Sequence, residues 1–184
     1  MGDSEDELGW IRKSREGDTQ AFGELVLRHQ RMIHALTYRM TGSLADSADL
    51  AQESFIRAFQ RLADFRGEAK FSSWLYQIAM HACLNWRTSH ARREQVHRNW
   101  AEQERVTGAK SSAEDRVSEE QTRQVQEALM KLPVKQRAAI VLTVYEDMNH
   151  AEAARVLGCS ETTVSWRVFA ARRKLKRWLQ KNRS

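Results

Sequence analysis

Apolar residues recur at steps of three and four along most of the chain, and this spacing predicts a succession of amphipathic helices. The clearest case begins at Asp49, where the apolar face comprises Leu50, Phe55, Ala58, Phe59 and Leu62. The loop 64–68 ends this period, because Gly67 favours backbone conformations that a helix does not use. A second helix is expected after it, capped by Ser72 or Ser73, with an apolar face of Trp74, Leu75, Ile78, Ala79, Ala82 and Trp86.

The preceding residues have the same periodicity. The stretch from Leu8 to Arg15 is predicted as a short helix that Gly17 ends. Asp18 or Thr19 then caps a long helix whose apolar face is formed by Phe22, Leu25, Val26, Met32, Ile33, Leu36 and Met40. This helix is expected to close at residues 42–43, and a separate short helix is expected at 44–47. Residues 1–91 are therefore expected to form a compact helical bundle.

The periodicity stops after residue 91. Residues 92–118 mix both charges with Gly108, Ser111 and Ser112 and carry few large apolar side chains, so we expect a flexible linker with helical edges. The helical period returns from 119, and Pro133 stands where a helix begins, a position that does not need its missing N–H. The predicted fold is all-α, with two small helical domains, 1–91 and 119–184, joined by the linker.

The second domain ends in the pattern of a helix-turn-helix. Ala153 and Ala154 are small enough to permit the close helix crossing that this motif requires. Residues 158–160 form the turn, and Ser160 can cap the second helix. The inner side of that helix is predicted to carry Val164, Val168, Ala171, Leu175 and Leu179. Its outer side, positioned for a major groove, carries Glu161, Thr162, Ser165, Trp166, Phe169 and Ala170.

The charge distribution favours a polyanionic partner for this end of the chain. The whole chain has 30 Lys and Arg against 24 Asp and Glu, a net charge of +6. Residues 149–184 hold nine basic and two acidic side chains, which leaves −1 for the rest. A basic block binds nucleic acid or is a solvated surface, and the turn spacing favours DNA over an ordinary helical hairpin. Such binding is expected to fall steeply with salt.

Cysteine usage and the N-terminus indicate a soluble intracellular protein. Cys83 and Cys159 are far apart and lack metal-ligand spacing, which is typical of a reducing compartment. The acidic start has the wrong charge for a signal peptide, and no apolar run is long enough to cross a membrane. The sequence has no glycine-rich phosphate loop and no metal-spaced His or Cys cluster. We therefore expect no enzyme activity and no cofactor or metal.

These stretches together resemble the extracytoplasmic-function, or group four, sigma factors of bacterial RNA polymerase. The run DSADLAQESFIRAFQRL is similar to regions 2.1–2.2 of that family, and FSSWLYQIAMHACLNWR is similar to regions 2.3–2.4. The run LPVKQRAAIVLTVYEDMNHAEAARVLGCSETTVSWRVFAARRKL is similar to region 4. The resemblance implies a cytoplasmic initiation factor that binds core RNA polymerase and promoter DNA, inserts into no membrane and is held inactive by an anti-sigma factor.

The resemblance also implies roles for single residues. Contact with the β′ clamp helices of the polymerase falls on Asp49, Gln52, Glu53 and Arg57, and the β flap is a second implied contact. Capture of the −10 strand, with a flipped base held by the loop, falls on Phe65, Arg66, Lys70, Phe71, Ser72, Gln77, His81 and Asn85. Contact with the −35 element falls on Thr162, Thr163, Ser165, Trp166, Arg167, Phe169, Ala170, Arg172, Arg173 and Lys174.

Alternatives stay open for several of these residues. Phe65 and Phe71 suit a core as well as a base pocket, and the charged side of the Asp49 helix is equally a solvated surface. His81 stands where the family often has asparagine. The family also often has arginine at residues 165 and 170 and serine at residue 166. Readout of guanine by arginine is then lost at two places, so we expect an unusual −35 sequence.

Three rival functions remain. A conventional helix-turn-helix regulator would bind an operator tightly without polymerase, but it leaves the DLAQE and WLYQIA stretches unexplained. An enzyme is disfavoured by the missing motifs. A helical adaptor that binds only protein is disfavoured by the basic C-terminal block.

Overall fold

The structure, a computed structural model, describes residues 2–97 and 113–181, and within those ranges it is built from helices without strands. This confirms the all-α prediction. The elements are α1 (Gly2–Arg15), α2 (Thr19–Thr41), α3 (Leu44–Gln60), the 3-10 helix η1 (Leu62–Asp64), α4 (Phe71–His97), α5 (Ala113–Met130), α6 (Val134–Ile140), the π-helix η2 (Val141–Tyr145), α7 (His150–Leu157) and α8 (Glu161–Lys181). Residues 98–112 of the expected linker lie outside the described residues, and its edges belong to α4 and α5.

Local signals place the N-terminal helices well, with two exceptions. The Asp18 side chain caps α2 by accepting hydrogen bonds from the amides of Gln20 and Ala21, and Gly42 ends it with a φ of 74°. The prediction of a separate helix at 44–47 is wrong, because Ser43 caps one continuous α3 through the amide of Asp46.

The start of α4 is the second exception. The helix begins at Phe71, so Ser72 and Ser73 lie in its first turn and do not cap it. The carbonyl of Lys70 accepts the first hydrogen bonds, from the amides of Ser73 and Trp74. The cap prediction is therefore wrong by two to three residues.

The C-terminal helices contain the expected helix-turn-helix. Asn149 and Glu152 form a reciprocal capping box at the start of α7. Gly158 ends α7 in the left-handed conformation, with a φ of 59°. Ser160 then accepts a hydrogen bond from the amide of Thr163, as predicted for the cap of α8.

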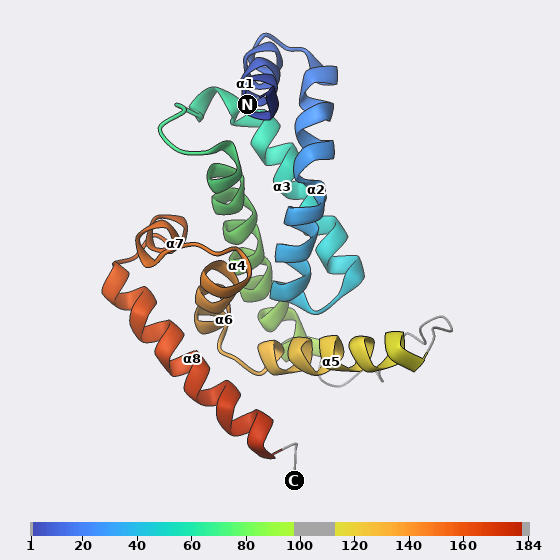
Figure 1. Cartoon of the computed structure of the whole chain (residues 1–184), viewed down its shortest axis with the longest axis vertical. Coiled ribbons are helices and arrows are strands. Elements are labelled where there is room, and N and C mark those ends of the chain that lie inside the picture. The colour runs from blue at the N-terminus through green and yellow to red at the C-terminus, as the bar shows by residue number, and fades with distance from the viewer. Residues whose placement is uncertain (1, 98–112, 182–184) are drawn as a thin grey trace.

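The two halves pack against each other around a continuous core. Helices α6 and α7 lie beside α4, α5 runs across the end of α2, and α8 forms the outer edge (Figure 1). Arg137 of α6 is only 1% exposed and donates to the carbonyl oxygens of Leu129, Met130 and Leu132 in its own half. The same guanidinium donates to the carbonyl of Met40 at the end of α2, 2.5 Å away.

A polar cluster also crosses between the halves, just after η2. Arg39 of α2 lies 3.0 Å from a carboxylate oxygen of Glu146 and stacks over Tyr145 at 4.4 Å. Tyr76 of α4 donates its hydroxyl to the second carboxylate oxygen. Burial raises the pKa of Glu146 above its ordinary value, although Tyr76 and Arg39 both act to lower it. The raising effect of desolvation on this pKa is larger than the lowering effects of Tyr76 and Arg39. The ionised form of Glu146 is therefore less favourable here than it would be in water.

Candidate nucleic-acid interface

The loop between α3 and α4 keeps both of its phenylalanines in the core. The Phe65 and Phe71 rings meet edge-on with centroids 5.5 Å apart, and both side chains are buried. Trp74 packs 5.4 Å from Phe65, and the ring of His29 lies 5.4 Å from Phe71. This packing supports the core alternative. It corrects the expectation that the Phe65 and Phe71 rings are available to a base.

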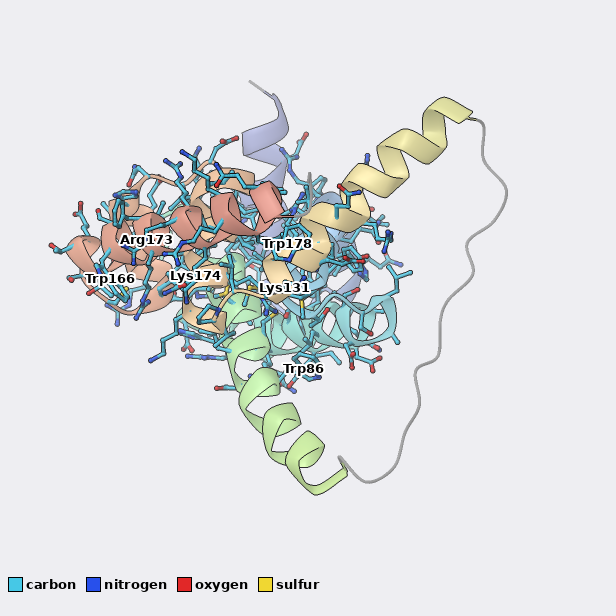
Figure 2. The ribbon with its side chains drawn as sticks, turned by 90° about the horizontal axis from the view of Figure 1, so that it is seen from below. Trp86, Lys131, Trp166, Arg173, Lys174 and Trp178 are labelled. Carbon is cyan, nitrogen blue, oxygen red and sulfur yellow. The ribbon has the colours of Figure 1, made fainter. Side chains whose placement is uncertain are left out.

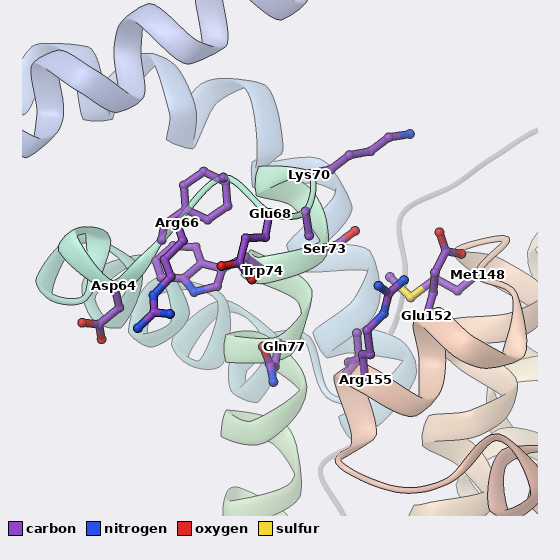
Figure 3. A pocket seen from close by; sticks show the side chains of 14 residues that line it. Asp64, Arg66, Glu68, Lys70, Ser73, Trp74, Gln77, Met148, Glu152 and Arg155 are labelled. Carbon is purple, nitrogen blue, oxygen red and sulfur yellow. The ribbon is translucent and has the colours of Figure 1, made fainter.

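The polar residues of the same loop line a pocket of about 350 Å³. Figure 3 shows its two walls, one from the loop and the start of α4, the other from α7 and the turn before it. The first wall carries Arg66, Glu68, Lys70, Ser73, Trp74 and Gln77, and the second carries Met148, Glu152 and Arg155. The half-buried Trp74 supplies aromatic surface to this pocket. Sequence reasoning assigned Trp74 to the core, because the helical period cannot show that a core residue also borders a cavity.

The remaining −10 candidates lie along α4. Gln77, His81 and Asn85 are spaced by four residues and therefore share one face of the helix. Gln77 is half-buried beside the pocket, whereas His81 and Asn85 are exposed. Ser72 is half-buried in the first turn. The structure thus brings Gln77 to the pocket that Arg66 and Lys70 line.

The outer face of α3 combines polar groups with an apolar groove. Asp49 and Gln52 are exposed, and Arg57 lies 2.5 Å from Glu53 in an ion pair along the helix. The groove between α2 and α3 has a volume of about 510 Å³ and is lined mainly by Phe22, Val26, Gln52, Phe55, Ile56 and Phe59.

Phe59 belongs to that groove and not to the closed core that the sequence predicts for it. Its side chain is 39% exposed, and its ring packs on Phe22 at 4.9 Å. The helical period places Phe59 on the correct side of α3, but the neighbouring helix does not cover it. The exposed apolar groove beside the charged face is a feature that sequence reasoning missed.

The outer face of α8 is exposed, basic and aromatic. Trp166 and Phe169 are 63% and 64% exposed, and the Arg173 guanidinium lies 5.8 Å from the Phe169 ring. Figure 2 shows Trp166, Arg173 and Lys174 along this helix. The exposed candidates are Thr162, Ser165, Trp166, Phe169, Arg172, Arg173 and Lys174. These side chains suit contact with a DNA duplex, because the cationic ones can bind phosphates and the others can contact base edges.

Three −35 candidates are less accessible. Ala170 is 7% exposed, because α8 packs on α6 and α7 along the same side. This corrects its assignment to the outer face. Thr163 is half-buried, and its hydroxyl lies 2.9 Å from that of Ser160 in the capping turn. Arg167 is also half-buried, with one guanidinium nitrogen 3.4 Å from the sulfur of Cys159.

Within residues that the structure describes, no group of three or more His, Cys, Asp and Glu side chains is arranged to hold a metal ion. Among the described helices, none combines the length and apolar character needed to cross a membrane.

Comparisons with known proteins match the two halves of the chain to two family regions. Residues 25–93 match the family Sigma-70 region 2, and residues 122–175 match the family Sigma-70, region 4. The ECF RNA polymerase sigma factor SigM of Mycobacterium tuberculosis is 36% identical over 164 residues, which cover 89% of this chain and 79% of SigM. The RNA polymerase sigma-H factor of Pseudomonas aeruginosa is 30% identical over 177 residues, 92% of each chain.

A solved structure shares the whole architecture. CnrH, in complex with the cytosolic domain of CnrY, superimposes with a TM-score of 0.68 at 27% identity. The superposition covers 96% of this chain and 97% of CnrH. With both family regions matched in order, and with relatives of 30% and 36% identity covered over 92% and 79% of their length, the chain belongs to the extracytoplasmic-function, group four, sigma factors of RNA polymerase.

Proposed function

We propose that this sigma factor holds the two elements of a promoter with two separate surfaces while it is docked on core RNA polymerase. One observation carries the proposal: the same chain presents an exposed aromatic and basic face on α8 and an aromatic-walled polar pocket at the start of α4. A duplex is bound through phosphates and groove edges. An extruded base requires a stacking surface. Each surface of this chain suits one of the two tasks.

The outer face of α3 docks on the β′ clamp helices. Asp49, Gln52, Glu53 and Arg57 supply polar contacts, and the apolar groove beside them accepts an apolar ridge of a helical partner. The β flap contacts the C-terminal half of the chain. The polymerase contributes the chemistry of RNA synthesis, so the sigma factor itself is not an enzyme, and it acts in the cytoplasm beside the polymerase.

The −10 strand binds along the loop and α4. Arg66 and Lys70 contact phosphates, Trp74 offers a stacking surface, and Gln77, His81 and Asn85 meet base edges. Ser72 lies at the start of this path. Phe65 and Phe71 support the loop from the core and do not touch DNA, because their rings are buried. Holding bases outside the stack stabilises the melted state of the promoter.

The −35 duplex receives the first half of α8 in its major groove. Thr162, Ser165, Trp166 and Phe169 face the bases, and the two aromatic side chains contact thymine methyl groups. Arg172, Arg173 and Lys174 contact phosphates. Since residues 165 and 170 lack guanidinium groups, the preferred sequence differs from one that arginine reads.

An anti-sigma factor inhibits the chain by covering a surface that the polymerase needs. The support is the likeness to CnrH, which was solved with the cytosolic domain of CnrY, together with the exposed apolar groove on α3. An apolar groove open to solvent favours a protein partner.

Two sets of substitutions test the assignment of surfaces in transcription assays with purified core polymerase. The double variant Gln52→Ala and Arg57→Ala is expected to lose co-purification with the polymerase and all initiation. Arg173→Ala with Lys174→Ala is expected to co-purify normally but to initiate weakly at promoters that depend on a −35 element. Lys135→Ala, an exposed change on α6, is the control. Tight operator binding by a chain that never co-purifies with polymerase would contradict the proposal and favour the regulator.

A further inference from the structure

His150, the first residue of α7, contacts the outer face of α8. Its Nδ1 atom lies 2.8 Å from the Oγ atom of Ser165, and both side chains are exposed. Ser165 is one of the residues that the proposed function places against the −35 bases. An imidazole from the first helix of the helix-turn-helix therefore bonds to a hydroxyl of the second helix that faces the groove.

The backbone around this contact is held on both helices. Reciprocal hydrogen bonds between Asn149 and Glu152 fix the first turn of α7, which contains His150. Ala153 of α7 and Val164 of α8 are fully buried, and the two helices pack against each other. The contact is therefore ordered before DNA binds, which lowers the entropy that binding costs.

The hydrogen bond from His150 decides what the Ser165 hydroxyl offers to a base. A neutral imidazole carries its proton on one of its two nitrogens and accepts at the other. The Nε2–H tautomer is the more stable one for an imidazole in water, so Nδ1 accepts the hydroxyl proton of Ser165. The Oγ atom then has only lone pairs left for the groove, and it binds a donor but not an acceptor.

An oxygen that only accepts distinguishes the bases by their amino groups. In the major groove adenine presents its N6 amino group and cytosine its N4 amino group, whereas guanine O6 and thymine O4 are acceptors. A guanine or thymine opposite Ser165 leaves two acceptors facing each other without a proton, which is unfavourable in a dehydrated interface. An arginine at residue 165 would have the opposite preference, because a guanidinium only donates and selects guanine.

We propose that His150 and Ser165 form one reading unit for the −35 element, which selects adenine or cytosine at a single position of that element. This inference rests on the proposed function, because that function places the outer face of α8 in the major groove. Ser165 contacts the base, and His150 is a positioning residue that acts through it. A serine hydroxyl without this partner donates or accepts and therefore distinguishes the bases poorly.

Selection of promoters by the complete holoenzyme tests the reading unit. The chain is assembled with core polymerase and offered a pool of promoter fragments in which only the −35 element is randomised, and the bound fragments are sequenced. Wild type is expected to prefer adenine or cytosine over guanine or thymine about fivefold at one position, the magnitude of a single hydrogen bond. Ser165→Ala is expected to lose this preference and to keep the preferences at other positions.

Two substitutions of His150 separate positioning from a direct contact with DNA. The amide of asparagine lies near the place of Nδ1, whereas glutamine is longer and places its amide near that of Nε2. His150→Asn is expected to keep the preference, because its amide oxygen accepts the proton of Ser165, and His150→Gln is expected to lose it. Loss in His150→Asn with retention in His150→Gln would show that Nε2 contacts the DNA, and it would overturn the reading unit.

A double variant measures whether His150 acts through Ser165. The affinity of the holoenzyme for the selected promoter is expected to fall no further when His150→Gln is added to Ser165→Ala. A further loss as large as that of His150→Gln alone would overturn the positioning role. Lys135→Ala, an exposed change on α6 outside the helix-turn-helix, is the control and is expected to keep the wild-type preference. Thermal unfolding establishes that every variant is folded.

The outcomes distinguish a failure of the reading unit from a failure of the proposed function. A −35 element selected equally by wild type, Ser165→Ala and His150→Gln would overturn the reading unit and leave the proposed function intact. A preference for guanine or thymine that both variants abolish would also overturn it, because the hydroxyl would then be donating. Selection of no −35 element by wild type would refute the proposed function, and the reading unit with it.

Discussion

Arg137 donates a hydrogen bond to the carbonyl oxygen of Met40, so a single side chain of α6 fixes the end of α2 across the interface between the two halves. The other donors of this guanidinium bind carbonyl oxygens at the end of α5 and in the turn before α6. Carbonyl groups at helix ends lack partners within their own helix. Arg137 thus satisfies orphan carbonyls from two helices at once and couples the folding of the two regions.

Arg137→Met is expected to destabilise the chain by about 3 kcal/mol, because several buried carbonyl oxygens lose a charged donor. Denaturation by urea measures the loss. Arg172→Met, at an exposed position of α8, is expected to change the unfolding free energy by less than about 0.5 kcal/mol. Equal effects of the two substitutions would show that Arg137 does not hold the interface.

Gly42, at the end of α2, lies close to the Met130 side chain of α5. A Cβ atom at this position would lie 3.0 Å from two atoms of the Met130 side chain, and the backbone has a φ of 74°. Gly17 has a φ of 96° with no neighbouring atom within 4 Å. Gly17→Ala is therefore expected to cost about 1 kcal/mol from the backbone alone, and Gly42→Ala is expected to cost more.

Met130→Ala separates the two contributions at Gly42. In the Met130→Ala background, the cost of Gly42→Ala should fall to that of Gly17→Ala, because no side chain has to move. Thermal unfolding of the four-protein cycle gives the coupling energy. A coupling energy of zero would exclude the steric explanation.

Glu146 predicts a pH dependence of stability. Its pKa is raised in the folded chain, first by desolvation and further by Asp147, against the lowering effects of Tyr76 and Arg39. Because the folded pKa is the higher one, the folded chain binds the proton of Glu146 more tightly than the unfolded chain does. The resulting stabilisation is complete below the unfolded pKa of about 4.3, and it is lost as the pH rises through the folded pKa.

Glu146→Gln isolates this effect, since glutamine stays neutral. As the pH falls from 7.5 towards 5, wild type is expected to gain unfolding free energy relative to Glu146→Gln. Urea unfolding at each pH measures the difference. A difference that is flat, or that changes in the opposite direction, would contradict a raised pKa for Glu146.

The two thiols are expected to react very differently. Cys83 is buried in α4, and burial raises its pKa to about 12, so almost none is thiolate at pH 8. Cys159 is partly exposed in the turn of the helix-turn-helix. A thiol reagent at pH 8 should label one cysteine quickly, and Cys159→Ser should abolish that fast phase. Two fast thiols would mean that α4 opens readily around Cys83.

The basic residues of α8 predict a salt-dependent contribution to DNA binding. Arg173→Ala is expected to weaken binding of duplexes of different sequence about equally and to reduce the slope of log affinity against log salt by about 1. Trp166→Ala is expected to change the preferred sequence instead. Fluorescence anisotropy on a panel of −35 duplexes distinguishes the two effects. An unchanged salt slope in Arg173→Ala would remove this residue from the phosphate contacts.

Local sequence signals predict the helices and turns of this chain because their causes are local. Asp18 as a cap, Gly158 as the end of α7 and Ser160 as the cap of α8 all act within a few residues. Ser43 shows the limit: the sequence identifies it as a boundary, but its side chain caps the whole of α3 rather than a separate short helix.

The site residues that were misplaced depend on packing between distant elements. The helical period cannot decide whether the Phe71 ring meets His29 in the core or a base in a pocket, since both uses need an inward aromatic. Ala170 has the spacing of an outer residue, yet neighbouring helices bury it. The contacts of Glu146 with Arg39 and Tyr76 join residues more than 60 positions apart, and no local pattern records them.

Run-off transcription with purified core polymerase, across a library of bacterial genomic fragments, tests the central claim most directly. Core polymerase alone is expected to start at few defined positions, and addition of the chain is expected to create a new set of start sites. Mapped 5′ ends should share two sequence elements at fixed distances upstream. An unchanged set of start sites, with protein that is folded, free of inhibitors and bound to the polymerase, would contradict the account.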